Sequence, residues 1–162
     1  MNIIAAADRN WAIGKDGGLL YHLPQDMKFF RETTQNSVVV MGRKTLESFP
    51  GGRPLKNRVN IVLTRNKEYE KDGVIICHDA DKLPEILKSY PKKEVFVIGG
   101  EEIYRLLLPM CNKAYITKID KEADADSFFP NLDNDTAWHK TKISETFSDN
   151  GICFNFVVYE RV

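Results

Sequence analysis

One carboxylate in the sequence stands among apolar residues where a helix is expected. Residues 19–34 read LLYHLPQDMKFFRETT, and Pro24 suits a first helical position because its missing N–H is not needed there. The apolar stripe of this helix would be formed by Leu23, Met27, Phe30 and Thr34, and Asp26 falls within it. Burial disfavours an ionised carboxyl group, so Asp26 is expected to hold its proton tightly and to be suited to acid catalysis. The alternative is an ordinary first-turn acid that complements the helix dipole.

Three strand ends carry residues suited to binding an anion. The apolar run 37–41 ends in Gly42-Arg43-Lys44-Thr45, and the run 59–64 ends in Thr64-Arg65. Free N–H groups at a helix start attract phosphate together with basic side chains. A second basic strand end would fit a 2′-phosphate on an adenine ribose. The run 94–98 ends in Gly99-Gly100, which lets a backbone approach a ligand. Each feature alone is also typical of a solvated turn, and neither G-x-G-x-x-G nor the P-loop motif occurs.

The elements that must position these residues alternate along the chain. Buried strands are expected at 2–7, 37–41, 59–64, 74–77, 94–98 and 114–119, with helices at 24–34, 46–49, 82–90 and 101–108. Residues 8–18 hold three glycines without periodicity and are expected to form a mobile loop, a candidate lid. Strands at 138–147 and 152–159 would close the chain as a hairpin packed on one face. The pattern predicts an α/β fold with a mostly parallel sheet and an antiparallel edge.

Composition restricts the kinds of partner. The chain has 43% hydrophobic residues and equal numbers of basic and acidic residues, 23 of each, so no overall field attracts nucleic acid or an anionic membrane. Cys77, Cys111 and Cys153 have no metal or redox spacing and are expected to be buried thiols in a reducing compartment. The scattered histidines give no support for a metal site. Without a signal peptide or an apolar span, the expected location is the cytoplasm.

Eight short motifs then occur in one order. They are Ile13-Gly14; Leu23-Pro24-Gln25-Asp26; Val40-Met41-Gly42-Arg43-Lys44-Thr45; Gly52-Arg53-Pro54-Leu55; Arg58-Val59-Asn60; Ile98-Gly99-Gly100 with Ile103-Tyr104; Tyr115-Ile116-Thr117; and Asp126 before Phe128-Phe129-Pro130. In this order and at these spacings the chain resembles dihydrofolate reductase of the bacterial type over its full length.

The resemblance implies a single domain, residues 1–162, with the dihydrofolate reductase-like fold. This is an eight-stranded, mostly parallel sheet with an antiparallel C-terminal edge and four flanking helices. It also implies the reaction, in which NADPH delivers hydride to C6 of 7,8-dihydrofolate and N5 is protonated. The product, 5,6,7,8-tetrahydrofolate, supplies one-carbon metabolism. The family is usually monomeric, is a target of antifolates, and implies no metal, nucleic-acid or membrane partner.

The resemblance also assigns the substrate residues. Asp26 matches the acid that pairs with N3 and the 2-amino group of the pterin and promotes protonation of N5 through water, and Thr117 would hydrogen-bond this carboxylate. Arg58 would pair with the α-carboxylate of the glutamate tail, a bidentate task for which Lys is a poor substitute. The apolar slot would be lined by Ile4, Ala5, Met27, Phe30, Leu55 and Ile98, with Tyr104 beside it.

The implied cofactor residues lie at the strand ends. Ala6, Ile13 and Gly14 would meet the nicotinamide. The pyrophosphate region would be held by Gly42, Arg43, Lys44 and Thr45 and by Gly99, Gly100, Glu101, Glu102, Ile103 and Tyr104. The 2′-phosphate would be read by Arg43, Thr64 and Arg65, next to Leu63. The Gly99–Gly100 peptide is expected to be cis, which is costly for a non-proline bond.

Three departures from the family pattern concern the site. Leu20-Tyr21 stands in place of Pro-Trp, although Tyr21 can still donate a hydrogen bond and stack in the catalytic pocket. Leu19 replaces a methionine of the lid, and Lys56-Asn57 replaces Pro-Gly before Arg58. Two rival functions are the NADPH-dependent reductase of riboflavin synthesis, which shares the fold, and a non-catalytic nucleotide-sensing module of flavodoxin-like shape. Asp26 together with Arg58 argues against the reductase, and an acid on an apolar helix face has no role in the sensing module.

Overall fold

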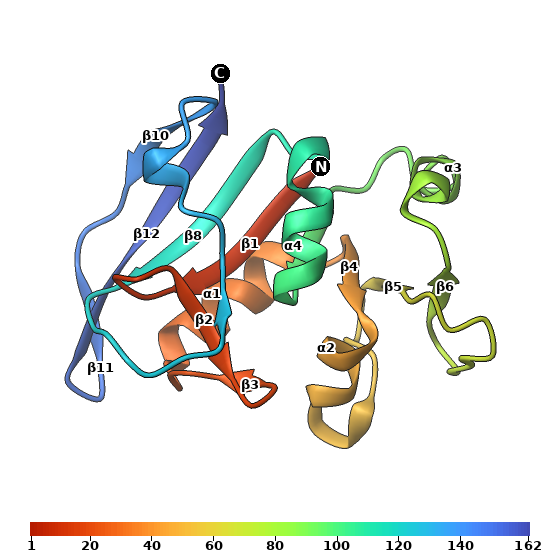
Figure 1. Cartoon of the computed structure of the whole chain (residues 1–162), viewed down its shortest axis with the longest axis horizontal. Coiled ribbons are helices and arrows are strands. Elements are labelled where there is room, and N and C mark those ends of the chain that lie inside the picture. Colours follow the sequence, from red (N-terminus) through yellow and green to blue (C-terminus); the bar gives the residue numbers. More distant parts are fainter.

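Short apolar runs form the parallel centre of one sheet, as predicted. The computed structural model describes residues 1–162. The six parallel strands are β1 (Asn2–Ala7), β4 (Val38–Gly42), β5 (Val59–Leu63), β6 (Ile75–Cys77), β7 (Val95–Gly99) and β8 (Lys113–Ile119). The spatial order β10-β12-β8-β1-β7-β4-β5-β6 places β1 near the middle (Figure 1). Because these strands are parallel, their carboxyl ends meet at one edge of the sheet, where ligands bind in α/β folds.

The C-terminal strands form the antiparallel edge. β12 (Ile152–Arg161) pairs with β8, and β10 (Trp138–Ile143) pairs with β12. The prediction of one strand over 138–147 is wrong, because the chain leaves the sheet after Ile143 and returns as β11 (Phe147–Asp149) against β12. Packing on one face only is also wrong. Phe154 is buried on one face of β12 and Tyr159 on the other, since both faces of this strand are covered.

Residues 8–18 were predicted to form a loop, but part of this segment is β-structure. They contain β2 (Ala12–Lys15), which forms a hairpin with β3 (Gly18–Leu19). β2 also pairs with β9 (Ser127–Phe128), a partner more than 110 residues away in sequence. A local pattern cannot reveal such a partner. We call residues 12–19 the lid hairpin.

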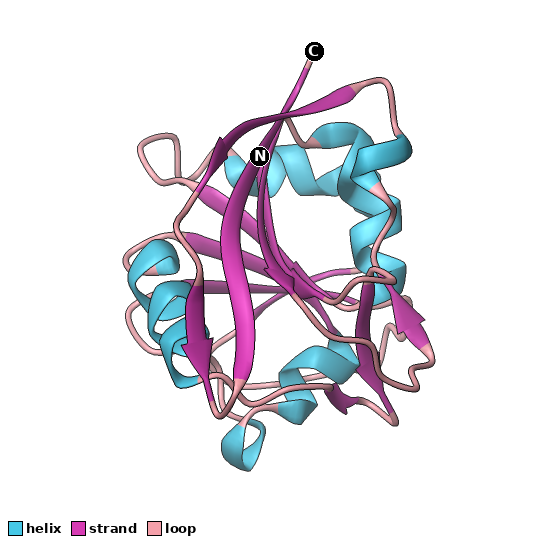
Figure 2. Cartoon of the chain, turned by 90° about the vertical axis from the view of Figure 1, so that its left-hand side faces the viewer, coloured by secondary structure: helices cyan, strands magenta, loops and turns pink.

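Four helices cover the sheet on both faces, as Figure 2 shows: α1 (Pro24–Thr34), α2 (Arg43–Ser48), α3 (Leu83–Leu87) and α4 (Glu101–Leu107). The helix predicted for 82–90 is shorter. Asp79 accepts the Asp81 N–H and begins a 3₁₀ turn at Ala80–Lys82, and residues after Leu87 make bonds of the 3₁₀ type, such as Tyr90 N–H to the Leu87 carbonyl. Short 3₁₀ turns also lie at Pro50–Gly52, Leu108–Met110 and Leu132–Asn134.

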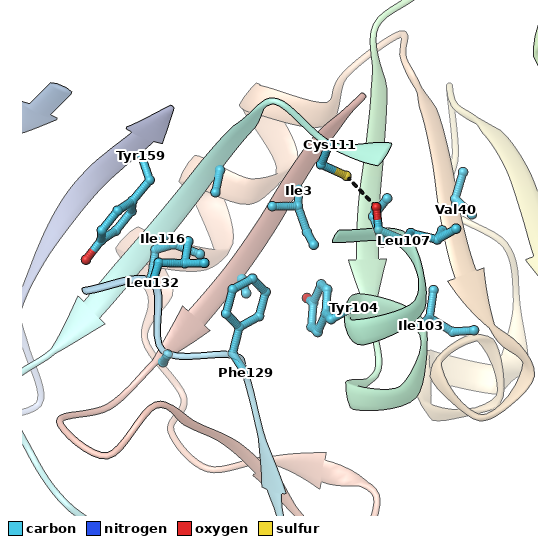
Figure 3. Packing of buried hydrophobic residues seen from close by; sticks show 14 of the residues in the cluster. Ile3, Val40, Ile103, Tyr104, Leu107, Cys111, Ile116, Phe129, Leu132 and Tyr159 are labelled. Atoms are coloured by element: carbon cyan, nitrogen blue, oxygen red, sulfur yellow. Dashed lines mark hydrogen bonds between the residues drawn. The ribbon is translucent and has the colours of Figure 1, made fainter. Parts of the chain in front are cut away.

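Alternation along the strands divides the apolar core between the two faces. Val38 and Val40 pack with α4, whose Ile103, Tyr104 and Leu107 are buried (Figure 3). Val39 and Met41 belong to the second face, with Leu46 of α2. Cys77 and Cys111 are buried as predicted, and the Cys111 thiol donates to the Leu107 carbonyl at 3.3 Å. Cys153 is exposed, contrary to the prediction, because it lies on β12 at the edge that pairs with β11.

No helix of the chain is both long enough and apolar enough to span a membrane.

Candidate active site

Asp26 lies on the side of α1 that faces the sheet. Its Oδ1 accepts a hydrogen bond of 2.6 Å from the hydroxyl of Thr117, which is buried in β8. The expected hydrogen bond between these two residues is therefore present. Met27, which the stripe also included, is 47% exposed. The 3.6-residue period of a helix places both the third and the fourth residue after Leu23 close to the same face. Packing against β8 turns Asp26 toward the sheet and leaves Met27 exposed.

The environment of Asp26 favours its neutral form. Burial raises the pKa of the Asp26 carboxyl above its usual range, and the charge of Asp149 raises it further. The hydrogen bond from Thr117 acts in the opposite direction because it stabilises the carboxylate. Burial is the largest of the three effects, so the sequence-based expectation of a tightly held proton agrees with the geometry.

The lid hairpin closes over Asp26. A cavity of about 40 Å³, room for a few waters, has Asp26 as its only charged wall residue. The other walls are apolar side chains and Tyr21: Ala6, Ala12, Ile13, Leu19, Leu20, Tyr21, Leu23 and Ile119. Asp126 fixes the hairpin from the other side, since its carboxylate accepts the Asp16 N–H at 2.9 Å and its own N–H donates to the Gly14 carbonyl at 3.1 Å.

Tyr21 contributes its ring to this cavity, while its hydroxyl is directed elsewhere. The hydroxyl donates to Asp8 Oδ2 at 3.3 Å. Asp8 is fully buried at the end of β1 and also accepts N–H groups from Asn10, Ala12 and Ala123. Tyr21 is thus tied to the root of the lid hairpin. Sequence reasoning did not identify Asp8, although an acid that directly follows a buried strand was a visible signal.

Most residues of the expected apolar slot share one cluster on the second face of the sheet. Ile4 and Ile98 are buried there, and Phe30 and Leu55 pack against it. Ala5 does not share this cluster, because alternation along β1 directs its side chain into the main core with Ile3 and Ala7. Tyr104 also lies in the main core (Figure 3). Its hydroxyl donates to the Ile4 carbonyl at 2.7 Å.

Arg58 is held against the C-terminal end of α1. Its Nε donates to Thr34 Oγ1 at 3.0 Å, and one terminal nitrogen donates to the Arg31 carbonyl at 3.3 Å. Partial burial, followed by the charge of Arg31, lowers the pKa of Arg58, but a guanidinium remains charged in proteins. Lys56-Asn57 preserves the turn before Arg58, because Asn57 takes a positive φ of 61°, a conformation that Asn tolerates.

Two glycine junctions lie side by side where β4 and β7 pair in parallel. A Cβ at Gly42 would lie 3.0 Å from Ile103 Cγ1, and Gly99, with φ of 119°, would place one 3.2 Å from the Tyr104 ring. The Gly99–Gly100 peptide is cis, as expected. Neither Gly42 nor Gly100 provides a side-chain cap, so the first N–H groups of α2 and α4 have no side-chain acceptor.

The basic residues near these junctions are in exposed ion pairs. Arg43 contacts both carboxylate oxygens of Glu47 at 2.6 Å, and Arg65 contacts Glu102 at 2.8 Å. Glu101 accepts the Phe128 N–H and thereby joins α4 to β9. Lys44 is exposed, while Thr45 lies near Gly100.

The end of β5 also has a histidine beside it. His78, which sequence reasoning missed, lies with Nδ1 2.9 Å from the Thr64 carbonyl oxygen. It follows β6, and only the parallel pairing of β6 with β5 brings it next to Thr64.

The arrangement can be compared with known proteins. A family model described as "Dihydrofolate reductase" matches residues 1–161. The chain belongs to the dihydrofolate reductase family. It is 36% identical to the dihydrofolate reductase of Bacillus subtilis, with 99% of this chain and 94% of that protein covered. For the dihydrofolate reductase of Staphylococcus haemolyticus the identity is 34%, and the shares are 100% and 96%.

A solved dihydrofolate reductase supports the fold. The enzyme from Enterococcus faecalis, complexed with NADP(H) and RAB-propyl, has a TM-score of 0.85 and 38% identity, with 99% of this chain and 95% of that chain covered. The bifunctional dihydrofolate reductase-thymidylate synthase of Glycine max is 37% identical over 99% of this chain. The chain spans about a third of the length of such plant relatives, 33% in this case.

Proposed function

We propose that this chain reduces 7,8-dihydrofolate to 5,6,7,8-tetrahydrofolate with NADPH as the hydride donor. The observation that carries this proposal is the Asp26–Thr117 pair, bonded at 2.6 Å beside an otherwise uncharged cavity under the lid hairpin. Because that cavity has room for a few waters only, a flat, nitrogen-rich ring would lie next to it, where the carboxyl group can bind the ring by hydrogen bonds and act on its protonation. Such a pocket does not suit a module that only senses a nucleotide.

Asp26 holds the pterin and favours protonation at N5. Its carboxyl oxygens face N3 and the 2-amino group, and the proton reaches N5 through water. The raised pKa of Asp26 keeps the neutral form populated to higher pH than in an ordinary aspartic acid. Thr117 fixes the orientation of the carboxyl group through its bond to Oδ1. The apolar walls exclude bulk water, which strengthens each polar contact inside the pocket.

Arg58 binds the α-carboxylate of the glutamate tail. Its contacts with Thr34 and the Arg31 carbonyl hold the guanidinium at one end of α1, whose first turn carries Asp26. One helix therefore positions both ends of the substrate. This second recognition element argues against the riboflavin-pathway reductase, which has no glutamate tail to bind.

NADPH fits the two glycine junctions. Gly42 packs closely on Ile103, and Gly99 packs closely on Tyr104. The first N–H groups of α2 and α4 have no side-chain acceptor, so they suit the pyrophosphate. Arg43, Thr64 and Arg65 would hold the 2′-phosphate. The ion pairs of the two arginines are exposed and contribute about 0–1 kcal/mol each, so a phosphate can replace the carboxylates. When bound, NADPH supplies the hydride for C6.

Replacement of Asp26 by Asn tests the function. The assay follows loss of NADPH absorbance with dihydrofolate as substrate, from pH 5 to pH 9. Asp26→Asn is expected to lower kcat at pH 7 about 10²–10⁴-fold, the usual contribution of general acid catalysis. Its rate should continue to rise at acid pH, where the substrate is protonated in solution. Asp72→Asn, which changes an exposed acid with no side-chain partner, is the matched control. Near wild-type turnover of Asp26→Asn at pH 7 would return Asp26 to the role of a first-turn acid.

A further inference from the structure

The turn segment, residues 148–150 at the end of β11 and the start of the turn to β12, is hydrogen-bonded to the start of α1. Asp149 Oδ2 accepts the backbone N–H of Gln25 at 2.8 Å, and Asp149 Oδ1 accepts the Gln25 side-chain amide at 2.8 Å. The same amide donates to the Ser148 carbonyl at 3.0 Å. Asn150 adds a side-chain bond of 3.4 Å to the His22 carbonyl. Four hydrogen bonds thus join the turn to residues directly before Asp26.

The start of α1 lacks a cap of its own. The N-cap residue is Leu23, which has no polar side chain, and Pro24 has no N–H. Gln25 therefore presents the first free N–H of the helix, and Asp149 accepts it from 124 residues away in sequence. A carboxylate at this position also complements the positive end of the helix. The turn supplies the cap that the local sequence does not provide.

Asp149 is also the charged group that acts on Asp26. The other polar groups beside Asp26 are neutral: the hydroxyl of Thr117 on β8, which donates to Oδ1, and Tyr21, which lines the same cavity. No lysine or arginine opposes the charge of Asp149 at this site, and the pKa of Asp26 is raised by that charge after the larger effect of burial. The turn therefore combines a mechanical contact and an electrostatic one.

We propose that Asp149 is a positioning residue for the reaction, which fixes Asp26 through Gln25. The negative charge of Asp149 acts on the same carboxyl group. This inference rests on the proposed acid role of Asp26. In this proposal Asp149 contacts neither the pterin nor the nicotinamide, and it acts through its neighbours on α1. Its two effects separate in substitution, because Asn keeps an oxygen that can accept the Gln25 N–H while removing the charge, whereas Ala removes both.

The test measures single-turnover hydride transfer against pH in Asp149→Asn, Asp149→Ala, Asp26→Asn and the control Asp72→Asn. Single turnovers separate chemistry from product release. The midpoint of the profile should move to lower pH in both Asp149 variants and stay in place in Asp72→Asn. The acid plateau should be lower in Asp149→Ala than in Asp149→Asn. Added salt should lower the wild-type midpoint more than that of Asp149→Asn, because it screens the Asp149 charge.

Two results would overturn the proposal: a midpoint in Asp149→Asn equal to that of the wild type, or equal plateaus in the Asn and Ala variants. Failure of the underlying function would look different, because Asp26→Asn would then keep the wild-type profile. Thermal melts confirm that each variant is folded before its profile is compared.

Discussion

Thr117→Val removes the one hydrogen bond that the side chain of Asp26 receives from within the protein. Thr117 is 3% exposed, and Val keeps the β-branched shape that suits β8. A hydrogen bond to a charged group contributes about 1.5–3 kcal/mol, whereas one to a neutral group contributes about 0.5–1.5 kcal/mol. The loss should therefore be larger where Asp26 is ionised than where it is protonated.

The expected change in melting temperature follows from chain length. At about 2.1 cal/mol/K per residue, unfolding of a 162-residue chain has an entropy of about 340 cal/mol/K, so 1 kcal/mol corresponds to about 3 °C. Thr117→Val should then lower Tm by about 4–9 °C near pH 8 and by about 2–4 °C near pH 4. The added apolar contact of Val offsets part of both losses equally, so the difference between the two pH values is the diagnostic quantity.

Calorimetric melts at both pH values measure this difference, and Thr117→Ser, which keeps the hydroxyl, is the control. The bond from Thr117 lowers the pKa of Asp26, so its loss should also move the pH–rate midpoint to higher pH. An equal loss of Tm at pH 4 and pH 8, with an unmoved midpoint, would refute the reasoning that Thr117 stabilises the Asp26 carboxylate.

Three further outcomes are expected. Because the pKa of Asp26 is raised in the folded state, the stability associated with its neutral form is fully present below its unfolded pKa of about 3.9 and is lost as pH rises through the folded value. Asp26→Asn should therefore match the wild type in urea denaturation near pH 4 and exceed it near pH 8; a less stable variant at pH 8 would contradict this. Arg58→Leu should weaken dihydrofolate binding in fluorescence titrations and leave NADPH binding unchanged, and a substrate without the glutamate tail should be indifferent to it. If that truncated substrate also loses affinity, Arg58 instead has a structural role in the loop that carries it. Replacing both Arg43 and Arg65 by Ala should raise KM for NADPH far more than for NADH. Equal effects on the two KM values would show that the two arginines do not bind the 2′-phosphate.

Much of the framework was predictable because its causes are local. Short apolar runs predict the six parallel strands, and Pro24 marks the first residue of α1. Gly42 and Gly99 stand where a Cβ would crowd Ile103 and Tyr104, so the close packing of the strand ends is visible as residue type. These features depend on backbone sterics and on apolar burial, both of which act on neighbours in sequence.

The errors share a different cause. The lid hairpin was missed because β2 depends on β9, and the buried side of α1 passes through Asp26 rather than Met27 because of the contact with β8. A period of 3.6 leaves the exact face of a short helix open. The pairing partner and the packed face are chosen only when distant segments meet.

The same distinction between local and long-range causes applies to the residues of the site. The sequence by itself determined which residues could do chemistry, above all an acid on an apolar helix face. Their partners depend on the tertiary structure: Thr117, which only the family resemblance implied, lies 91 residues from Asp26, and Asp149, which nothing in the sequence indicated, lies 124 residues from Gln25. These contacts follow from strand order and register, which the long-range pairing of the sheet establishes. Strand order brings the partners together, and the low-dielectric surroundings that result make an ordinary aspartic acid hold its proton.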